Sequence, residues 1–430
     1  MNKVTAAETG GLTRSQVVAW RNAVFGIFGL CGIGLSTWVS RTPAIRDSLG
    51  ATTAEMGWIV FGLAAGSIVG LVLSSHVLIT FGSARTIAGA MIGGAVGLAA
   101  AGIGATLFST PILVVAGLAV FGAGTGMCDV AMNVEGAAAE RVLGRTVMPL
   151  FHAAFSVGTV AGAGLGAVAE LIGVPIAVHF GAVAAVVIIG VLIAIRRLQP
   201  YPDAPNTTVP TPLEPGSQPA DGWRSRLGIW RERRTILIGL VILGMAFAEG
   251  SANDWLALAM VDGHHVSNAA GAFVFGIFVL SMTVGRVAGV FLLDRFGRVP
   301  VLRFSAALAA AGLLVVIFVP NAVIAGIGVV LWGLGSALGF PVGMSAAADD
   351  PEVAAARVSA VATIGYFAFL VGPPSIGFLG GHIGLLHALL LVLILVALAG
   401  FTSGAAREPM REPARESAHA TIEPAGAPTD

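Results

Sequence analysis

The segment TILIGLVILGMAFAEGSANDWLALAMV, residues 235–261, decides the fold of this chain. About 20 mostly apolar residues let a helix cross a lipid bilayer, and this segment is that long and apolar except for Glu249 and Asp254. An acid in the middle of a membrane helix costs about 3 kcal/mol on insertion scales, so it is expected chiefly where it handles a proton, an ion or a substrate. The segment therefore predicts a membrane protein with a polar path through it.

The composition of the whole chain agrees with this. Hydrophobic residues make up 56% and charged residues 11%, whereas a soluble domain has about 25% charged residues. The formal net charge is zero, which gives no argument for a nucleic-acid partner. The two cysteines, Cys31 and Cys128, lie in apolar segments, so we expect no disulfide framework, metal site or cofactor. No nucleotide loop, zinc motif or hydrolase triad is recognisable, and we expect neither an enzyme nor an ATP-driven pump.

Apolar segments of similar length recur along the chain and predict twelve membrane-spanning helices. The predicted spans are residues 22–39, 56–80, 85–108, 111–134, 147–171, 174–195, 235–261, 269–293, 299–319, 322–347, 358–380 and 385–402. A polar, Pro-rich stretch separates the sixth span from the seventh. Its basic end, residues 224–234, is amphipathic enough to lie along a membrane surface.

The predicted spans fall into two sets of six, which favours an all-α integral membrane fold of two bundles. The expected parts are an N-terminal segment (1–21), a first bundle (22–195), a central loop (196–234), a second bundle (235–403) and a disordered tail (404–430).

The basic residues orient this topology, because they concentrate on the cytoplasmic side of membrane proteins. Nearly all of them fall on the side of the termini and the central loop, whereas the opposite loops hold only Arg41 and Arg46. Lys3 is the single Lys among many Arg, and with the Ala and Gly content this is typical of a high-GC bacterial genome. We therefore expect a bacterial inner-membrane protein with both termini in the cytoplasm.

The two predicted halves also share short matches at a nearly constant offset. The matched pairs are Phe61-Gly62 with Phe275-Gly276, Gly82 with Gly297, and Trp38 with Trp255. Two like halves are the arrangement of transporters that rock about a central site.

The segment Asp294-Arg295-Phe296-Gly297-Arg298 resembles the D-R-x-G-R loop of the major facilitator superfamily, and the resemblance covers nearly the whole chain. It implies twelve helices in two pseudo-symmetric bundles, with Asp294, Arg295 and Arg298 pairing with charges at neighbouring helix ends. The corresponding first-half stretch, residues 78–85, keeps only Gly82 and Arg85 of the pattern. Ion pairs between helix ends are therefore expected in the second half. In the first half, Arg85 is the charged residue of this pattern that remains.

Further segments are similar to particular branches of this superfamily. Residues 38–45 with Leu49-Gly50, and residues 249–255, resemble the MosC-type rhizopine transporters. Residues 128–133 resemble the fourth helix of fucose permeases, although Val134 stands where that family often has Pro. Fucose permeases are proton-coupled sugar importers whose acid at this place takes up the proton, so the resemblance implies this role for Asp129.

Acids and amides within the predicted spans are the first candidates for chemistry. Asp129 and Asn133 are four residues apart and share a helix face, as do Glu249 and Asn253. We take Asp129 and Glu249 as proton-coupling candidates, and Asn133 and Asn253 as substrate-binding candidates. The alternative for Asp129 and Asn133 is a static hydrogen-bonded pair.

Three further charged residues are candidates for gating. Asp254 is five residues from Glu249, about 140° round a helix, so the two acids are expected to face different places. Asp254 lies near the outer end and is expected to pair with Arg41, as an outer gate or a structural ion pair. Arg286 is expected to neutralise a helix acid or to bind substrate, or else to stabilise the inner end of its helix by snorkelling.

Ring-bearing residues complete the candidate site. Trp38 and Trp255 would stack on a sugar-like ring, or else belong to the interfacial aromatic belt. Tyr366 and Phe369 rank below them as substrate-binding candidates. His152, near the inner end of the fifth span, would bind substrate or relay protons near pH 7, or else be an ordinary hydrogen-bonded polar group.

These patterns favour a secondary transporter of a small polar solute, sugar-like or cyclitol-like, coupled to protons and working by alternating access. Its expected partners are the solute, protons and the lipid bilayer, and we expect a monomer without nucleic acid. The first alternative is an exporter of drugs or metabolites from the same superfamily. The second is a membrane sensor or scaffold that has kept the fold and lost transport.

Overall fold

The computed structural model describes residues 12–144, 147–199, 228–350 and 353–407. These residues are almost wholly helical and include no strand. Twelve helices among them are long and apolar enough to cross a membrane, which confirms the predicted number. Most of the predicted central loop and tail, and residues 224–227 of the basic stretch 224–234, lie outside the described residues.

The helices divide into two groups along the chain. The first comprises α1 (Arg14–Ser40), α2 (Thr42–Leu49), α3 (Thr53–Phe81), α4 (Ser83–Ile103, continued by a π-helical turn, Gly104–Phe108), α5 (Pro111–Leu143), α6 (Met148–Leu171) and α7 (Ile176–Ile195). The second comprises α9 (Arg233–His264), α10 (Asn268–Phe296), α11 (Arg298–Phe318), α12 (Ala322–Ser336), α13 (Gly339–Ala347), α14 (Ala354–Ile383), α15 (Leu385–Ala388) and α16 (Leu390–Thr402).

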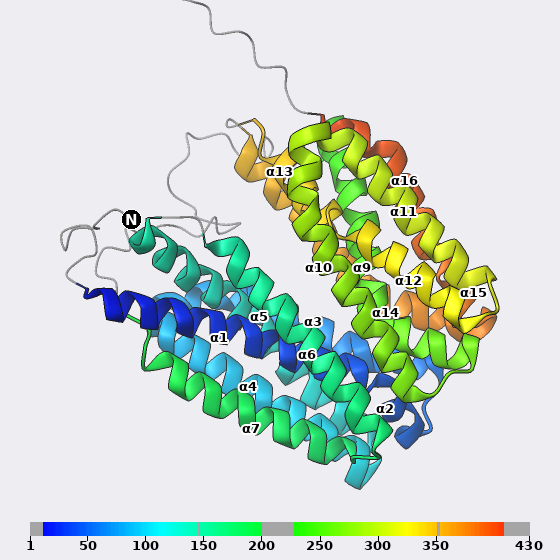
Figure 1. Cartoon of the computed structure of the whole chain (residues 1–430), viewed down its shortest axis with the longest axis horizontal. Helices are drawn as coiled ribbons and strands as arrows, with labels where there is room; N and C mark the ends of the chain where they lie inside the picture. Colours follow the sequence, from blue (N-terminus) through cyan, green and yellow to red (C-terminus); the bar gives the residue numbers. More distant parts are fainter. Residues whose placement is uncertain (1–11, 145–146, 200–227, 351–352, 408–430) are drawn as a thin grey trace, which may run out of the picture.

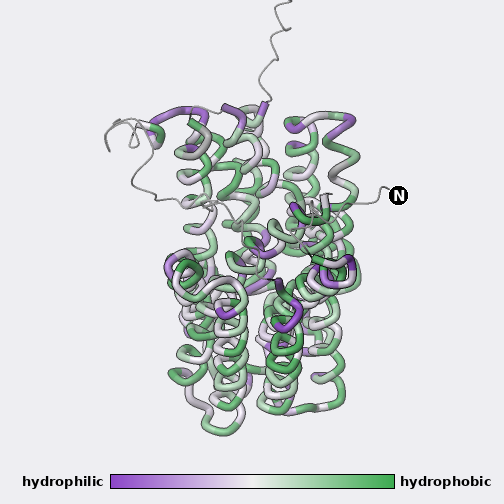
Figure 2. The backbone as a smooth tube through the Cα atoms, turned by 90° about the vertical axis from the view of Figure 1, so that its left-hand side faces the viewer, coloured by the Kyte–Doolittle hydropathy of each residue, from purple (hydrophilic) through white to green (hydrophobic). Residues whose placement is uncertain are grey.

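Each group packs into its own bundle, and the bundles form a V (Figure 1). The ribbons converge at the end that holds the short helix α2, which we call the α2 end. They diverge toward the end that holds α13 and the start of α1, which we call the α13 end. Hydrophobic residues run along most of each helix, and hydrophilic ones gather at the helix ends and at a few interior points (Figure 2).

The internal repeat has a conformational counterpart in the two bundles. Gly82 ends α3 and precedes α4 at φ +77°, and Gly297 ends α10 and precedes α11 at φ +74°. Residues with a Cβ atom avoid this region, so each sharp turn favours glycine. The two halves thus join their second and third spans in the same way.

Small residues let helices within a bundle touch at the backbone. A methyl group on Gly158 of α6 would overlap the carbonyl of Gly29 of α1, and one on Gly162 would overlap the hydroxyl of Ser36. The absence of side chains at these glycines therefore sets the distance between α1 and α6.

The first helix begins earlier than its hydropathy predicts. The predicted start was residue 22, but α1 begins at Arg14. Thr13 and Gln16 form a capping box, in which the side chain of each accepts a hydrogen bond from the backbone N–H of the other. A capped polar turn extends a helix without adding apolar residues, so hydropathy alone misses it.

An ion pair at the α13 end gives the first testable prediction. Arg357 donates to both carboxylate oxygens of Glu232, at 2.7 and 3.1 Å. Burial alone would raise the pKa of Glu232, but the hydrogen bonds from Arg357 and Thr235 outweigh it and hold this pKa below its usual range near 4.5. The pair therefore stabilises the fold fully above pH 4.5, and this contribution is lost as pH falls through the lowered folded-state pKa.

We expect the melting temperature in detergent to fall more steeply below this pH for the unaltered protein than for Glu232→Gln. The pair contributes at most about 1 kcal/mol because Glu232 is partly exposed. Parallel acid profiles for the two proteins would contradict the assignment.

Candidate functional site

A cavity of about 260 Å³ lies between the two bundles. The first bundle lines it with residues of α1, α3 and α5, and the second with residues of α9 and α14. The lining residues are Leu35, Val39, Val60, Leu63, Ala64, Ser67, Ile68, Leu71, Thr125, Gly126, Asp129, Gly250, Asn253, Asp254, Tyr366 and Phe369. At about 30 Å³ per water molecule, the space holds a small solute of roughly sugar size.

The cavity brings together five residues singled out from the sequence. Asp129 lines it from α5, Asn253 and Asp254 from α9, and Tyr366 and Phe369 from α14. Neighbouring turns of α3 and α5 add the hydroxyls of Ser67 and Thr125. The site thus combines two carboxylates, hydroxyl and amide groups and two aromatic rings, all from membrane-spanning helices.

Asn133 and His152 are not among the residues that line the cavity. The Asn133 side-chain amide donates to the Asp129 carbonyl at 2.8 Å and lies 3.4 Å from the Asp129 carboxylate. The His152 Nε2 atom lies 3.2 Å from the Asn133 side-chain oxygen. A continuous polar chain therefore runs from Asp129 through α5 to α6.

Glu249 does not line the cavity, although it shares α9 with residues that do. Its carboxylate pairs with Arg286 of α10 at 3.0 Å. This confirms the expectation that Arg286 neutralises a helix acid. It also confirms that Glu249 and Asp254 face different places, since only Asp254 reaches the cavity.

The predicted Arg41–Asp254 pair is wrong. Arg41 pairs with Glu170 of its own bundle at 3.0 Å and donates to the Val174 carbonyl at 2.8 Å. Arg41 directly follows the last residue of α1, and its side chain reaches Glu170 near the end of α6 instead of the cavity. Asp254 has no hydrogen bond or ion pair to any described residue.

A polar latch joins the bundles at the α2 end, and the sequence did not predict it. Arg46 of α2 pairs with Asp262 of α9. Asn268 at the start of α10 donates to Asp47 at 2.9 Å. Burial alone would lower the pKa of Arg46, but Asp262 and Asp47 outweigh it and raise this pKa, so Arg46 stays cationic. Sequence spacing gave no signal because the partners lie more than 200 residues apart.

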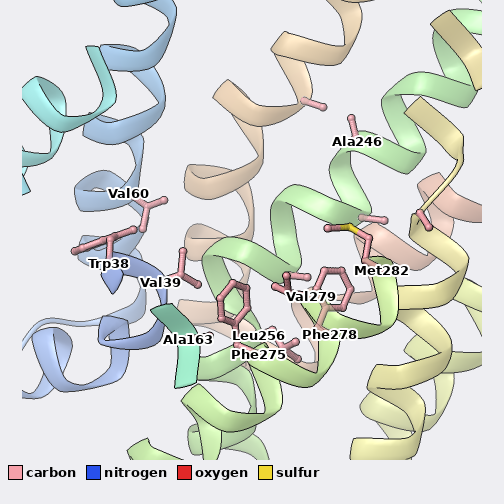
Figure 3. Close-up of a cluster of buried hydrophobic side chains, with 14 of the residues drawn as sticks. Trp38, Val39, Val60, Ala163, Ala246, Leu256, Phe275, Phe278, Val279 and Met282 are labelled. Carbon is pink, nitrogen blue, oxygen red and sulfur yellow. The ribbon is translucent and has the colours of Figure 1, made fainter. Parts of the chain in front are cut away.

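Close apolar packing supports this latch. A Cβ atom at position 57 of α3 would lie 3.2 Å from the Cα atom of Gly377 of α14. Val39 and Ala163 of the first bundle lie next to Leu256 and Phe275 of the second (Figure 3). The bundles therefore pack tightly beside the α2 end, and solute cannot pass there in this conformation.

Removing the latch cation is expected to loosen the α2 end. For Arg46→Ala, loss of a partly exposed ion pair costs roughly 1 kcal/mol, which raises the fraction of molecules open at this end about fivefold. The readout is the rate at which a maleimide labels Ala163→Cys, in protein with Cys31 and Cys128 replaced by Ala. Residue 163 is fully buried, so labelling reports opening of this end. We expect faster labelling than in the latch-intact protein and near-normal labelling in Arg46→Lys; equal rates in all three would contradict the latch.

The two tryptophans do not form a stacking platform. Trp38 and Trp255 are fully buried, and neither lines the cavity. Trp255 packs against the α3–α14 contact, where its ring would lie 3.1 Å from a Cβ atom at position 377. Both expectations for these residues are therefore wrong, because they lie inside the protein rather than in the site or at the lipid interface.

Of the three charged residues expected to pair at the α13 end of the second half, only Arg298 has an ion pair to a described residue. Arg298 pairs with Asp349 at 2.7 Å, and Arg234 pairs with the same carboxylate at 2.8 Å. Arg295 lies over the Phe296 ring, 5.5 Å from its centroid. Asp294 is exposed.

The first half has a different arrangement at this end. Glu135 is buried, and its carboxylate accepts from the Trp20 indole at 2.6 Å and from the Ser83 hydroxyl. Its donors are therefore Trp20 and Ser83, whereas Arg85 is exposed. Among the described residues no cluster of His, Cys, Asp and Glu is able to hold a metal ion.

Comparison with known proteins places this architecture in a family. The model of the Major Facilitator Superfamily matches residues 23–373 and 253–427. An uncharacterised transporter of Sinorhizobium fredii is 32% identical over 85% of this chain and 92% of its own length. The membrane protein MosC of Rhizobium meliloti is 27% identical over 84% of both chains.

Solved structures share the fold at low sequence identity. The nucleoside transporter NupG superposes with a TM-score of 0.71 at 16% identity, over 91% of this chain and 98% of that one. The fucose transporter FucP in its outward conformation superposes with a TM-score of 0.61 at 16% identity, over 92% of this chain and 100% of that one.

Proposed function

Because the chain belongs to the Major Facilitator Superfamily, we propose that it is a proton-coupled secondary transporter of a small polar solute, sugar-like or cyclitol-like. The observation that carries the proposal is the cavity between the bundles, lined from both sides by acids, hydroxyls and an amide. A site shared by two rigid bundles is exposed to one side of the membrane or the other as the bundles rock.

Asp129 is the proposed carrier of the coupling proton. It lines the cavity, and among the described residues its carboxylate has only the long 3.4 Å contact with Asn133. A carboxylate in a membrane helix without a cationic partner is costly unless it is protonated. Asn133 and His152 extend the polar path from this acid toward α6.

Glu249 remains a proposed second coupling acid with a different requirement. Its partner Arg286 would have to move away before the carboxylate could take a proton. Protonation of Glu249 would therefore be linked to a change of position of α10 relative to α9. Asn253 and Tyr366 are proposed to hydrogen-bond the solute from the second bundle.

The proposed orientation puts both termini and the α13 end in the cytoplasm of a bacterial cell, with the protein in the inner membrane. In this orientation the α2 latch seals the outer side, and the conformation faces inward. The concentration of basic residues at the α13 end supports this assignment.

Uptake into proteoliposomes tests the proposal. A thermal-shift panel of sugars, cyclitols and other small solutes first identifies a ligand, since binding to the folded state raises the melting temperature. Accumulation of that ligand, driven by an imposed pH difference and abolished by a protonophore, is expected. Ligand binding without flux would favour the sensor or scaffold, and movement of hydrophobic drugs alone would favour the exporter.

A further inference from the structure

The neutral imidazole of His152 has an acceptor atom to spare. The Asn133 side-chain amide donates to the Asp129 carbonyl at 2.8 Å, which leaves the Asn133 side-chain oxygen as an acceptor. His152 Nε2 lies 3.2 Å from that oxygen, so Nε2 carries the hydrogen when the ring is neutral. The Nδ1 atom of the neutral ring is then an acceptor without a hydrogen bond to a described residue.

Arg286 of the second bundle has donors to spare and lies across the interface from His152. Its guanidinium carries five N–H groups, and its ion pair with Glu249, at 3.0 Å, uses one nitrogen. Arg286 is near enough to His152 to act on its charge. His152 is exposed and Arg286 is half-buried, so water reaches both side chains. The two residues are therefore the facing ends of two polar chains, one in each bundle.

The antiparallel packing of α6 and α10 places the histidine and the arginine at one level (Figure 1). Glu170 near the end of α6 lies 3.5 Å from Asn268 at the start of α10, so the two helices run in opposite directions. They touch again where a Cβ atom at position 276 would lie 3.5 Å from the Ala163 Cβ atom. From this contact, eleven residues back along α6 lead to the histidine, and ten residues on along α10 lead to the arginine. At about 1.5 Å per residue, both lie about 15 Å toward the α13 end.

The helices packed against α6 present few charges to the imidazole. These helices are chiefly α1, α10 and α5. α1 presents the Phe28 ring, edge-on, with the ring centroids 5.2 Å apart. α5 presents Asn133 with the Asp129 carboxylate behind it, and α10 presents Arg286 with Glu249 of α9 behind it. The charge of the imidazole is therefore opposed mainly by one cation, which belongs to the other bundle.

We propose that His152 and Arg286 form a switch through which a proton on the imidazole governs closure of the α13 end. When the ring is neutral, Nδ1 accepts a hydrogen bond from the guanidinium as the bundles approach, and this bond ties α6 to α10. When the ring is protonated, Nδ1 is itself a donor and two cations face each other, so the α13 end stays open.

This switch goes beyond the proposed function, because it acts in the protein without solute. A transporter that has released its solute and its proton at one end must close that end to return. Closure that requires a neutral His152 lets the protein return only after the proton has left. His152 is thus a positioning residue that reports the proton state of the first bundle to the second.

Distances at the α13 end test the switch in solute-free protein in lipid vesicles. Spin labels replace the exposed Arg141 and Arg303, in protein with Cys31 and Cys128 replaced by Ala. We expect the fraction with short distances to be at least about tenfold larger at about pH 8 than at about pH 5, the range in which histidine changes its charge. Unit charges about 6 Å apart at an effective dielectric constant of about 20 repel strongly enough for this change. Equal fractions at the two pH values would overturn the proposal.

Variants with opposite expected signs separate the switch from a merely structural role. His152→Gln keeps an acceptor and takes up no proton, so its closed fraction should be high and equal at the two pH values. His152→Lys carries a charge at both, so its α13 end should stay open at both. His382→Gln removes an exposed histidine of α14 at the α2 end and should keep the pH dependence. Shifts of His152→Gln and His152→Lys in the same direction, or a pH dependence that persists in His152→Gln, would overturn the proposal.

The outcomes also separate the switch from the proposed function. Proton-driven accumulation by a protein whose α13-end distances do not depend on pH would overturn the switch and leave the proposed function standing. Closure that depends on pH and on His152, without proton-driven flux of any solute, would uphold the switch and remove the proposed function.

Discussion

A disulfide across the α2 end is expected to stop transport completely and reversibly. A Cβ atom at position 380 of α14 would lie 3.0 Å from the Thr53 Cγ2 atom of α3, across the bundle interface. Disulfides form where the two Cβ atoms lie about 3.5–4.5 Å apart, so Thr53→Cys with Gly380→Cys is suited to a cross-link. Because alternating access requires these helices to separate, the oxidised protein should show only background flux, and a reductant should restore it.

A cross-link inside one bundle provides the matched control. A Cβ atom at position 62 of α3 would lie 3.0 Å from the Val115 Cγ1 atom of α5. Gly62→Cys with Val115→Cys thus joins the same helix, at the same spacing, to a neighbour that moves with it. Both constraints are made in protein with Cys31 and Cys128 replaced by Ala, and cross-linking is checked by the shift in gel mobility. Full transport by the oxidised Thr53/Gly380 variant would show that the α2 end need not open.

Loss of proton-driven accumulation is the expected result for Asp129→Asn. A pH difference of about two units stores roughly 2.7 kcal/mol per proton, enough for about hundredfold accumulation at one proton per solute. Asn cannot take up a proton, so this accumulation should disappear. The Asn side chain still fills the same space. Exchange of labelled solute outside for unlabelled solute inside, which needs no proton gradient, should therefore persist.

The comparison needs both measurements on the same vesicles. Retained exchange with lost accumulation identifies Asp129 as the coupling acid, because a damaged site would lose both. Glu55→Gln, which keeps a capping side chain at the start of α3, should accumulate solute normally. Full proton-driven accumulation by Asp129→Asn would refute the assignment.

The membrane topology was predictable because one physical quantity decides it. Apolar segments of about 20 residues are stable only in a bilayer or in a large protein core. The twelve predicted spans correspond to the twelve helices long and apolar enough to cross a membrane. The errors fall at helix ends and breaks. The predicted span 322–347 is two helices, α12 and α13, with Ala337 and Leu338 between them.

The candidate site was predictable only where depth in the membrane carried the signal. Asp129, Asn253 and Asp254 were singled out as polar residues inside apolar segments, and all three line the cavity. Partners were harder to predict, because they come from other helices. The separation of 216 residues between Arg46 and Asp262 leaves no trace in local spacing.

Aromatic residues were ranked in the wrong order for a similar reason. Trp38 and Trp255 sit near helix ends in the sequence, which is compatible with a site, an interface or a core. Their burial depends on the helices that pack against α1 and α9, and only the assembled bundles reveal these contacts. Tyr366 and Phe369, ranked lower, line the cavity because α14 turns that face toward the first bundle.

The central claim is that two bundles rock about one cavity, and paired distances at the two ends of the molecule test it most directly. Spin labels on Ser48 and Ser267 report the α2 end, and labels on Arg141 and Arg303 report the α13 end; all four side chains are exposed. We expect the protein in lipid vesicles, given an identified solute and a change of pH, to populate longer α2-end distances together with shorter α13-end distances. Distances that stay fixed at both ends, or that change in the same direction at both, would contradict the account.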